Sequence, residues 1–540
     1  MSKNLELASD VLRELIARGV KEFCICPGAR NAPLVSLLST QKMGLRVYSF
    51  FEERSAAFFA LGRIRRTSSP VAVVTTSGTA VGELLPAVME AYYTQLPLVL
   101  LTADRPRRYR GSGAPQAAEQ VGIFGIYAGY SFDLQEDERA DLSSVIWNCP
   151  IHFNLCFDEP LLDLDSQMDS LLLGASSFSP ADQLDFYFDS NSLAEVRSFF
   201  QAVQYPMVIV GMLQPKEREA VTDLLLTLQC PTYLEATSGL REEKKLAPFQ
   251  IKLSDRVQER IKEGHYPWDG VIRIGGIPTL RLWRDLDLDL KAMKVLSVSS
   301  APFTGLGRSS ALFMGPIEVL ARQIIREVQD GGWRLEPQSL AQWLALDQKK
   351  QVALEALLHE AVNSEPSFFH ALSQQIPQES VVYVGNSLPI RQWDLAATYE
   401  SQAFDLWASR GLNGIDGQVS TFLGYAHPKK ENWAILGDLT ALYDLPGPWI
   451  LPQLKETIVN LVVINNGGGK IFSRMFEDPI FQNVHSTRFK AWADLWGLDY
   501  ECWEEISQIR TGAQKSRIIE VRPDEFTTQR FWKSYQTLTR

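Results

Sequence analysis

Two polar motifs near the C-terminus carry the residue types of a metal site. Gly437-Asp438-Leu439 and Asn465-Asn466 are separated by 25 residues, and each motif comes directly after a short apolar run. A carboxylate and an amide carbonyl are hard oxygen ligands that suit Mg²⁺ (or Mn²⁺), and Mg²⁺ commonly completes its shell with phosphate oxygens. Gly467 and Gly468 allow the backbone to approach an ion and a diphosphate closely. We therefore predict a metal site at Asp438, Asn465 and Gly467.

Two acidic residues, Glu52 and Glu53, follow the apolar run Leu45–Phe50 and begin a predicted helix that reaches about Arg66. Acidic side chains at a helix start complement the helix dipole. On these residues alone, this structural explanation is the stronger one.

Short apolar runs alternate with helical patterns in both end regions of the chain, which predicts parallel sheets covered on both faces. Thr75–Ala80 is expected to open a helix that ends near Thr94, and residues 1–19 form an amphipathic pattern. Sites in open parallel sheets lie at the carboxyl ends of strands, where both motifs above fall. The predicted strands are Lys21–Cys26, Leu45–Phe50, Val71–Val74, Leu98–Leu101, Pro206–Val210, Val271–Ile274, Val381–Val384, Trp433–Leu436 and Leu461–Ile464.

The 540 residues suggest three to four domains at ~150 residues each. The succession of apolar run, turn and second apolar run over Val71–Leu101 resembles that over Trp433–Ile464. This likeness predicts two related α/β domains flanking a third. Ser177–Ser192 is rich in Ser, Asp and Pro and is interpreted as a linker, and a second boundary falls within Gly331–Lys350. We predict three doubly wound domains, over residues 1–180, 190–340 and 350–540.

Composition narrows the class of protein. The 53 basic and 64 acidic residues give a net charge of −11, which disfavours nucleic acid as a partner. An anionic substrate would therefore need locally concentrated positive charge. Six sparse cysteines are typical of free thiols in a reduced protein rather than of a disulfide framework. The chain shows neither a membrane-spanning run nor a signal-peptide pattern, so we expect a cytoplasmic protein.

The Gly-Asp-x, 25 residues, Asn-Asn pattern resembles the diphosphate–metal motif of thiamine diphosphate enzymes. That resemblance implies thiamine diphosphate as cofactor and a glutamate on the other end domain that binds the aminopyrimidine ring. It selects Glu53 as the catalytic residue and leaves Glu52 to the helix start. It also implies a set of cofactor-binding residues: Ser77, Gly78, Thr79, Ile415, Gly437, Asp438, Leu439, Asn465, Gly467 and Gly468.

Seven segments together resemble the 2-succinyl-5-enolpyruvyl-6-hydroxy-3-cyclohexene-1-carboxylate synthase family of menaquinone and phylloquinone biosynthesis. The likeness covers both end domains in order and is weak in the middle. The segments are 26–33, 51–54, 76–80, 101–106, 410–417, 437–444 and 465–469.

This resemblance implies a pyrimidine-binding, a middle and a diphosphate-binding domain. It also implies a homodimer or dimer of dimers with active sites between chains. The implied reaction decarboxylates 2-oxoglutarate and adds the resulting carbanion to isochorismate in a 1,4 fashion. Both substrates are dicarboxylates, which the planar fork of arginine suits. The implied substrate-binding residues are Arg30, Arg105, Gln116, Arg281, Ser387, Arg391 and Arg410.

Some positions depart from the family pattern. Ala29 and Asn31 replace hydroxyl residues, Leu412 replaces a small residue and Leu280 stands where a basic one is expected, which puts fine substrate contacts in question. Two alternatives stay open: an acetolactate-synthase-like lyase of 2-oxo acids, and a cofactor-binding relative without catalysis. We assign no role to the two histidines nearest the motifs, His427 and His485.

Overall fold

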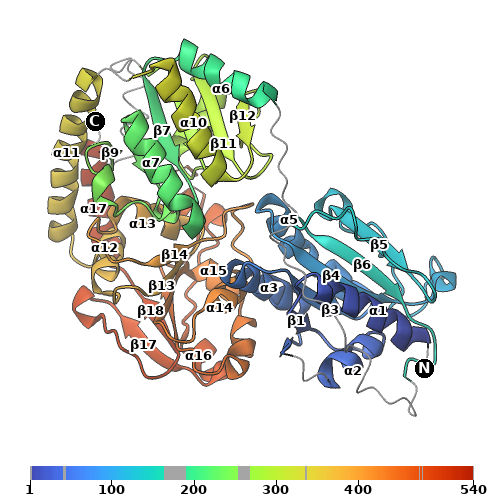
Figure 1. The fold of residues 1–540 in the computed structure, drawn as a ribbon. Helices are drawn as coiled ribbons and strands as arrows, with labels where there is room; N and C mark the ends of the chain where they lie inside the picture. The colour runs from blue at the N-terminus through green and yellow to red at the C-terminus, as the bar shows by residue number, and fades with distance from the viewer. Residues whose placement is uncertain are drawn as a thin grey trace. The chain divides into compact units, whose positions relative to one another are not determined.

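The structure is a computed structural model that describes residues 3–40, 44–162, 190–252, 268–334, 337–473, 475–476 and 478–538. In these ranges the chain forms three six-stranded sheets with helices packed against them (Figure 1). Parallel strands covered on both faces consist of continuous apolar runs, and β3 (Val71–Thr75) and β7 (Pro206–Val210) are buried at every position. The expectation of a parallel α/β fold is confirmed.

The first sheet has the strand order β2-β1-β3-β4-β6-β5, and every neighbouring pair is parallel. Helices α1 and α2 pack together, and their leucines join strand residues such as Phe23 and Val99 in one core. The elements are α1 (Lys3–Ala17), β1 (Glu22–Ile25), α2 (Ala32–Thr40), β2 (Arg46–Ser49), α3 (Glu53–Thr67), β3, α4 (Thr79–Gly82), α5 (Leu85–Tyr93), β4 (Leu98–Asp104), β5 (Tyr130–Leu134) and β6 (Ile151–Cys156).

The third sheet repeats this topology. Its order is β14-β13-β15-β16-β18-β17, which is the same succession of relative positions as in the first sheet. The predicted likeness of the two end regions is therefore confirmed at the level of strand order. The elements are α11 (Pro337–Glu360), α12 (Glu365–Gln375), β13 (Val381–Val384), α13 (Leu388–Ala396), β14 (Asp405–Trp407), α14 (Gln418–Tyr425), β15 (Asn432–Gly437), α15 (Asp438–Tyr443), β16 (Val459–Ile464), α16 (Lys490–Trp496), β17 (Asp499–Trp503), β18 (Arg517–Val521) and α17 (Glu525–Leu538).

The middle sheet has a different order, β12-β11-β10-β7-β8-β9. Counted along the chain this is the 3-2-1-4-5-6 arrangement of doubly wound dinucleotide-type folds. The elements are α6 (Ser190–Ala202), β7, α7 (Arg218–Leu228), β8 (Thr232–Leu234), β9 (Gln250–Ile251), β10 (Gly270–Ile274), α9 (Arg281–Leu288), β11 (Lys294–Ser299), β12 (Ala311–Met314) and α10 (Ile317–Gly331).

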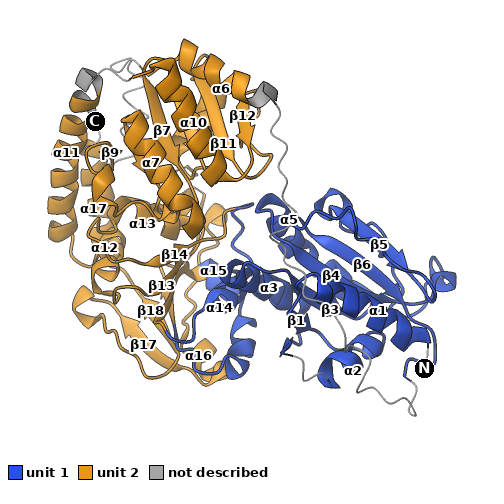
Figure 2. Cartoon of the chain, in the orientation of Figure 1, with its two compact units in different colours: residues 1–185, 411–429, 439–459 blue, residues 186–410, 430–438, 460–540 orange. Residues whose placement is uncertain are grey.

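The described chain divides into two compact units (Figure 2). Unit 1 comprises residues 1–185, 411–429 and 439–459, and unit 2 comprises residues 186–410, 430–438 and 460–540. The three sheets fall inside the three predicted ranges, whereas two segments of the range 350–540 belong to unit 1. The domain limits stay a prediction. Residues 177–189 of the predicted linker lie outside the described residues, and α6 begins at Ser190.

Within unit 1, α3 and α14 pack closely because two glycines face each other's backbones. A Cβ atom on Gly62 would lie 2.0 Å from the carbonyl oxygen of Thr421, and one on Gly424 would lie 2.1 Å from that of Phe59. Any larger residue at either position would push the helices apart. This contact places the segment 411–429 against the helix that begins at Glu53.

One expected element differs from the structure. The single helix predicted from Thr75 to about Thr94 is two helices, α4 and α5, and residues 75–78 are not helical. Gly78 has φ +87°, outside the helical region, and Pro86 stands in the first turn of α5, where its missing N–H costs nothing. The break leaves Ser77-Gly78 as an open turn at the end of β3.

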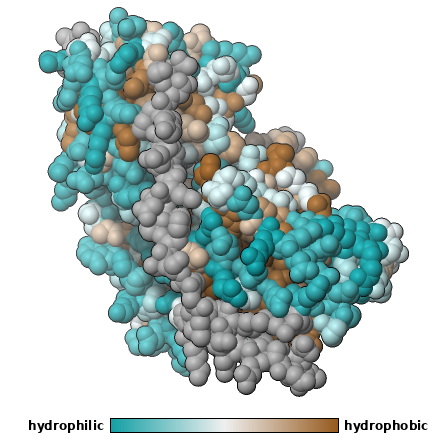
Figure 3. Space-filling model, turned by 45° about the vertical axis from the view of Figure 1, so that its right-hand side comes forward, coloured by the Kyte–Doolittle hydropathy of each residue, from teal (hydrophilic) through white to brown (hydrophobic). Residues whose placement is uncertain are grey.

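The surface and the cysteines fit the composition. The face drawn in Figure 3 is largely hydrophilic, with hydrophobic residues exposed in places. Among the described residues, we find no helix with the length and apolar character needed to cross a membrane. All six cysteines are free thiols, and four of them are buried.

Candidate active site

In unit 2, the carboxylate of Asp438 lies between the ends of two strands. Asp438 follows β15 directly, and its Oδ2 accepts hydrogen bonds from the backbone N–H groups of Gly467 and Gly468, both at 2.9 Å. The two glycines adopt φ values of +80° and +138° that other residues rarely adopt. The strand order puts β15 beside β16, so the two predicted motifs meet as expected.

The side chain of Asn465 has a defined orientation. Its amide nitrogen donates to the carbonyl oxygen of Thr487 at 2.9 Å and to the carboxylate of Glu520 at 2.8 Å. Since both acceptors are oxygens, the amide group cannot be reversed without losing both bonds. The carbonyl oxygen is therefore the atom that Asn465 offers to a ligand.

These donors fit Mg²⁺ or Mn²⁺. Asp438 and Asn465 supply hard oxygens, and a glycine carbonyl adds a third of the same kind. Among the described residues we find no group of three or more His, Cys, Asp or Glu side chains that could hold a metal. A site of this composition would take its remaining ligands from a phosphate. Asn465, Asn466 and Gly467 also line a polar cavity of about 730 Å³.

Three residues that contact Asp438, Asn465 or Asn466 were not predicted to belong to the site. The His485 Nε2 lies 3.3 Å from Asp438 Oδ2. Glu365 and Glu520 are buried acids whose carboxylates bind the side-chain amides of Asn466 and Asn465. Burial, followed by the charge of Asp438, raises the pKa of Glu365 to about 7, although hydrogen bonds from Asn466 and Gln392 oppose the shift. For Glu520 the sequence offered one signal, which is that a glutamate stands inside the mostly apolar strand β18 (Arg517–Val521).

In unit 1, the two acidic residues at the start of α3 have different environments. Glu52 is the N-cap, and its carboxylate accepts the backbone N–H of Ser55 at 2.8 Å. Glu53 makes no such cap and is half-buried. Burial is the main cause that raises its pKa, with smaller contributions from Glu52 and Glu83, while its own backbone N–H lowers it. Glu52 is thus the helix-start acid, as expected, and the catalytic role of Glu53 stays a prediction.

The turn Ser77–Thr79 follows β3 in unit 1. Ser77 is buried, and the backbone N–H of Gly78 donates to the side-chain oxygen of the buried Gln120 at 2.8 Å. A Cβ atom on Gly78 would lie 3.4 Å from the Cα of Gln116. Gln116 is exposed and has φ +56°. These predicted cofactor- and substrate-binding residues therefore come together.

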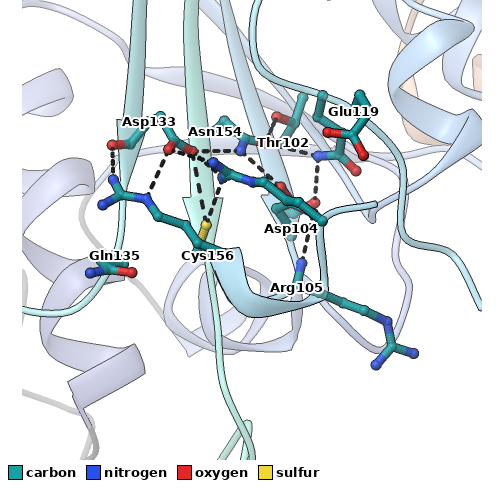
Figure 4. Close-up of polar contacts among 12 residues, drawn as sticks. Thr102, Asp104, Arg105, Glu119, Asp133, Gln135, Asn154 and Cys156 are labelled. Atoms are coloured by element: carbon teal, nitrogen blue, oxygen red, sulfur yellow. Dashed lines mark hydrogen bonds and ion pairs between the residues drawn. The ribbon is translucent and has the colours of Figure 1, made fainter. Parts of the chain in front are cut away.

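Arg105 directly follows β4 and lies beside a buried polar network (Figure 4). Its backbone N–H donates to Asp104 at 2.8 Å, while its guanidinium points away from the network and donates to the carbonyl oxygen of Pro115 at 2.9 Å. Asn154 bridges Asp104 and Asp133 at 3.0 and 2.9 Å. Burial raises the pKa of Asp104, although Asn154 and the N–H of Arg105 oppose the shift.

Arg30 is buried in unit 1 beside the turn after β1. It donates to the carbonyl oxygen of Phe157 at 3.0 Å and lies 3.2 Å from the carboxylate of Glu159. Asn31, one of the departures from the family pattern, holds this turn: it accepts from Gly28 N–H and donates to the carbonyl oxygen of Cys26, both at 2.9 Å. The departure at Asn31 therefore has a structural use.

Ile415 also belongs to unit 1, in the segment that leads into α14. It is half-buried, and Gly417 follows it with φ +60°. A Cβ atom on Gly417 would lie 2.0 Å from the ring of Phe58, so the segment passes close to α3. Leu412 is 43% exposed. Leu439 is in unit 1 as well, at the second position of α15.

The remaining predicted arginines lie in unit 2. Arg410 is buried and donates to Asn386 at 2.8 Å and to Thr279 at 2.9 Å, so it joins the middle and third sheets. Desolvation and the positive charge of Arg410 lower the pKa of Arg391, which donates to the carbonyl oxygen of Ser387 at 2.6 Å.

Arg281 follows Thr279 by two residues, begins α9 and is 65% exposed, with Asp285 3.8 Å away. The predicted residues are thus divided between the two units. Unit 1 holds Arg30, Glu53, Ser77, Gly78, Thr79, Arg105, Gln116, Ile415 and Leu439, and unit 2 holds Arg281, Ser387, Arg391, Arg410, Gly437, Asp438, Asn465, Gly467 and Gly468.

Comparison with known proteins identifies the class. Residues 5–123 match the family model described as thiamine pyrophosphate enzyme, N-terminal TPP binding domain. A solved structure of a Mycobacterium smegmatis protein assigned to the thiamin diphosphate-dependent enzymes aligns with a TM-score of 0.69 at 15% identity. It covers 96% of this chain and 99% of the other, and shows a shared fold. The chain is a thiamine diphosphate-dependent enzyme.

Curated relatives narrow the class further. The chain is 42% identical over 538 residues to the 2-succinyl-5-enolpyruvyl-6-hydroxy-3-cyclohexene-1-carboxylate synthase of Bdellovibrio bacteriovorus, with 99% of each chain covered. It is 36% identical to that of Akkermansia muciniphila, with 98% of each covered, and 30% identical to that of Bacillus pumilus, with 91% and 88% covered. The chain belongs to the 2-succinyl-5-enolpyruvyl-6-hydroxy-3-cyclohexene-1-carboxylate synthase family.

Proposed function

We propose that the enzyme decarboxylates 2-oxoglutarate and adds the resulting four-carbon unit to isochorismate, giving 2-succinyl-5-enolpyruvyl-6-hydroxy-3-cyclohexene-1-carboxylate. The observation that carries this proposal is the family membership over the full chain, combined with the oxygen donors gathered at Asp438 and Asn465. This function is favoured over the acetolactate-synthase-like alternative because every curated relative reported above carries the synthase name.

The residues expected to hold the metal and the cofactor fall into two sets. Asp438, Asn465 and Gly467 would hold Mg²⁺ or Mn²⁺, and the turn Ser77–Thr79 and Ile415 would contact the organic part. When bound, thiamine diphosphate supplies the carbanion equivalent for carbon–carbon bond formation. The backbone N–H groups of Gly467 and Gly468 donate to Asp438, so they would hold in place the carboxylate that binds the metal.

Glu53 would hold and move one proton. It is half-buried, and the raised pKa of its carboxyl keeps the protonated form populated at a higher pH than usual. A carboxyl group with these properties can give a proton to a ring nitrogen and later accept it again, which suits general acid–base catalysis. Glu52 is already occupied by the N-cap and is excluded from this role.

The arginines would bind the substrate carboxylates. Arg410 is anchored by Asn386 and Thr279, so its position is fixed before a substrate arrives. Arg391 lies close enough to Arg410 for the positive charge of Arg410 to lower the pKa of Arg391. Two adjacent arginines can pair with a dicarboxylate, although the buried carboxylates of Glu235 and Asp394 offset part of their positive charge.

The direct test gives purified enzyme 2-oxoglutarate and isochorismate with thiamine diphosphate and Mg²⁺, and measures CO₂ release and isochorismate consumption. Turnover of pyruvate alone would favour the alternative lyase. A wild-type protein no faster than its Glu53→Gln variant would show that catalysis has been lost. Asp438→Ala should abolish Mg²⁺-dependent cofactor binding, and unchanged binding would show that the metal site lies elsewhere.

We also propose that the working enzyme is at least a homodimer whose active sites combine Glu53 of one chain with Asp438 of another. The support is the family resemblance. Mixing inactive Glu53→Gln with inactive Asp438→Ala protein, then exchanging subunits, tests it. If the two residues act across chains, each mixed dimer contains one intact site and activity returns. Continued inactivity after verified exchange would contradict the proposal.

A further inference from the structure

The tandem pair Asn465-Asn466 is held from two sides by buried carboxylates. The amide nitrogen of Asn465 donates to Glu520 at 2.8 Å, and that of Asn466 donates to Glu365 at 3.0 Å. Glu520 comes from β18, the neighbour of β16, whereas Glu365 is the first residue of α12. The exposed fractions of Glu520 and Glu365 are 0% and 4%, so neither carboxylate is solvated.

The surroundings of Glu520 define which group it can bind. Its two oxygens also accept the hydroxyl of Tyr500 at 2.8 Å, the backbone N–H of Phe489 at 2.9 Å and the guanidinium of Arg488 at 3.3 Å. Every partner is a donor, so the carboxylate acts only as an acceptor. Asn465 must therefore present its NH₂ group to Glu520 and direct its carbonyl oxygen elsewhere.

Glu365 accepts a hydrogen bond from the amide nitrogen of Asn466. One carboxylate oxygen accepts from Gln392 at 2.6 Å and the other from Asn466. The Asn466 carbonyl oxygen is buried and has no hydrogen-bond partner in the part of the chain that the structure describes. A buried, unsatisfied acceptor is costly in a folded protein unless a ligand, ion or water completes it.

We propose that Glu520 and Glu365 are positioning residues of the metal–diphosphate site. Each fixes the orientation of one asparagine amide, so that the amide oxygens of Asn465 and Asn466 face the bound group. The inference rests on the proposed metal site and adds two residues that do not touch it. Outer partners that orient metal ligands commonly change metal affinity 10–100-fold when they are mutated.

The test measures Mg²⁺ affinity of the full-length protein with thiamine diphosphate present, by calorimetry, together with the electron paramagnetic resonance spectrum of bound Mn²⁺. Glu520→Gln should weaken Mg²⁺ binding about 10–100-fold and alter the Mn²⁺ spectrum. Glu365→Gln should weaken binding by a smaller factor, since Asn466 is not among the predicted metal ligands. Glu504→Gln is the matched control, because Glu504 lines the same cavity but pairs with Arg522.

A polarity exchange separates positioning from general structural damage. Asn465→Asp keeps an oxygen ligand but faces Glu520 with a second carboxylate, so binding should fall. Adding Glu520→Gln to that variant restores a donor–acceptor pair and should recover at least tenfold of the lost affinity. The corresponding pair is Asn466→Asp with Glu365→Gln.

The outcomes distinguish the two proposals. If wild-type binds Mg²⁺ normally, Asp438→Ala does not, and the Glu520 and Glu365 variants match the control, the positioning inference is wrong and the metal site stands. The positioning inference is also wrong if the double variants bind Mg²⁺ no better than Asn465→Asp or Asn466→Asp alone. If Asp438→Ala binds Mg²⁺ as well as wild-type, the metal site itself is wrong.

Discussion

The buried carboxylate of Glu90 accepts a hydrogen bond from the backbone N–H of Gly411 at 2.8 Å. Its second oxygen accepts the N–H of Leu412 at 2.7 Å, and a Cβ atom on Gly411 would lie 2.6 Å from that carboxylate. A side chain of α5 thus anchors the segment that carries Ile415. The two residues are 321 positions apart, so no local sequence pattern predicts this hydrogen bond.

Replacing Glu90 with Gln should destabilise unit 1. The amide has one acceptor oxygen for two N–H donors, so one backbone group is left unsatisfied in a buried place. We expect a loss of about 2 kcal/mol in the free energy of unfolding, measured by urea denaturation. Glu83→Gln is the control, because Glu83 is exposed nearby. Equal stability of both variants would show that the anchor contributes little.

Glu53→Gln should slow turnover by about 10²–10⁴-fold while cofactor binding persists, because only the proton-holding group is changed. Glu52→Ala should do the opposite. Loss of its cap to Ser55 should cost about 1 kcal/mol of stability with catalysis preserved. Steady-state rates and thermal unfolding of both variants decide between these roles. If Glu52→Ala is the slower enzyme, the two roles have been assigned in the wrong order.

Arg410→Lys should raise KM for the dicarboxylate substrates by about tenfold, because an ammonium group cannot reproduce the two bonds to Asn386 and Thr279. Arg284→Lys, at a position 62% exposed, serves as the comparison. KM and kcat are measured separately for each substrate. An unchanged KM in Arg410→Lys would remove this residue from substrate binding.

The stability of unit 1 should depend on pH through Asp444. This side chain is fully buried, and its carboxylate accepts a hydrogen bond from the backbone N–H of Ser420 at 2.7 Å. Burial is the main cause that raises its pKa to about 6 from the ordinary 3.8, with Ser420 and Arg54 opposing. The unfolded state therefore binds fewer protons than the folded state between about pH 4 and 6, and stability falls as pH rises through this window.

Asp444→Asn removes that titration. The free energy of unfolding of the variant relative to wild-type should rise between pH 4 and 7, by at most about 3 kcal/mol. Urea unfolding at a series of pH values measures the difference. Parallel pH profiles for the two proteins would mean that Asp444 titrates normally in the folded state.

Much of the fold followed from local patterns. The buried strands β7 and β13 begin and end where their apolar runs do, because a strand covered on both faces needs an unbroken run. The run Leu98–Leu101 underestimates β4, which continues to Asp104 because Thr102 and Asp104 pair with Asn154 and Cys156. That polar residues continue this strand could not be predicted from the apolar pattern, because it depends on their pairing with β6.

The candidate site divides in the same way. The sequence by itself predicted Asp438, Asn465 and the glycines as a metal site, because these residues follow two apolar strands and are of the types that a metal and a diphosphate require. Together with the family resemblance, it also predicted Glu53 rather than Glu52 as the catalytic residue. Only the tertiary structure shows that Glu520 and Glu365 bind the side-chain amides of Asn465 and Asn466. It alone also shows that Glu90 binds the backbone that leads to Ile415. A buried carboxylate finds its donor through strand order and helix packing, and those bring together residues from distant parts of the chain.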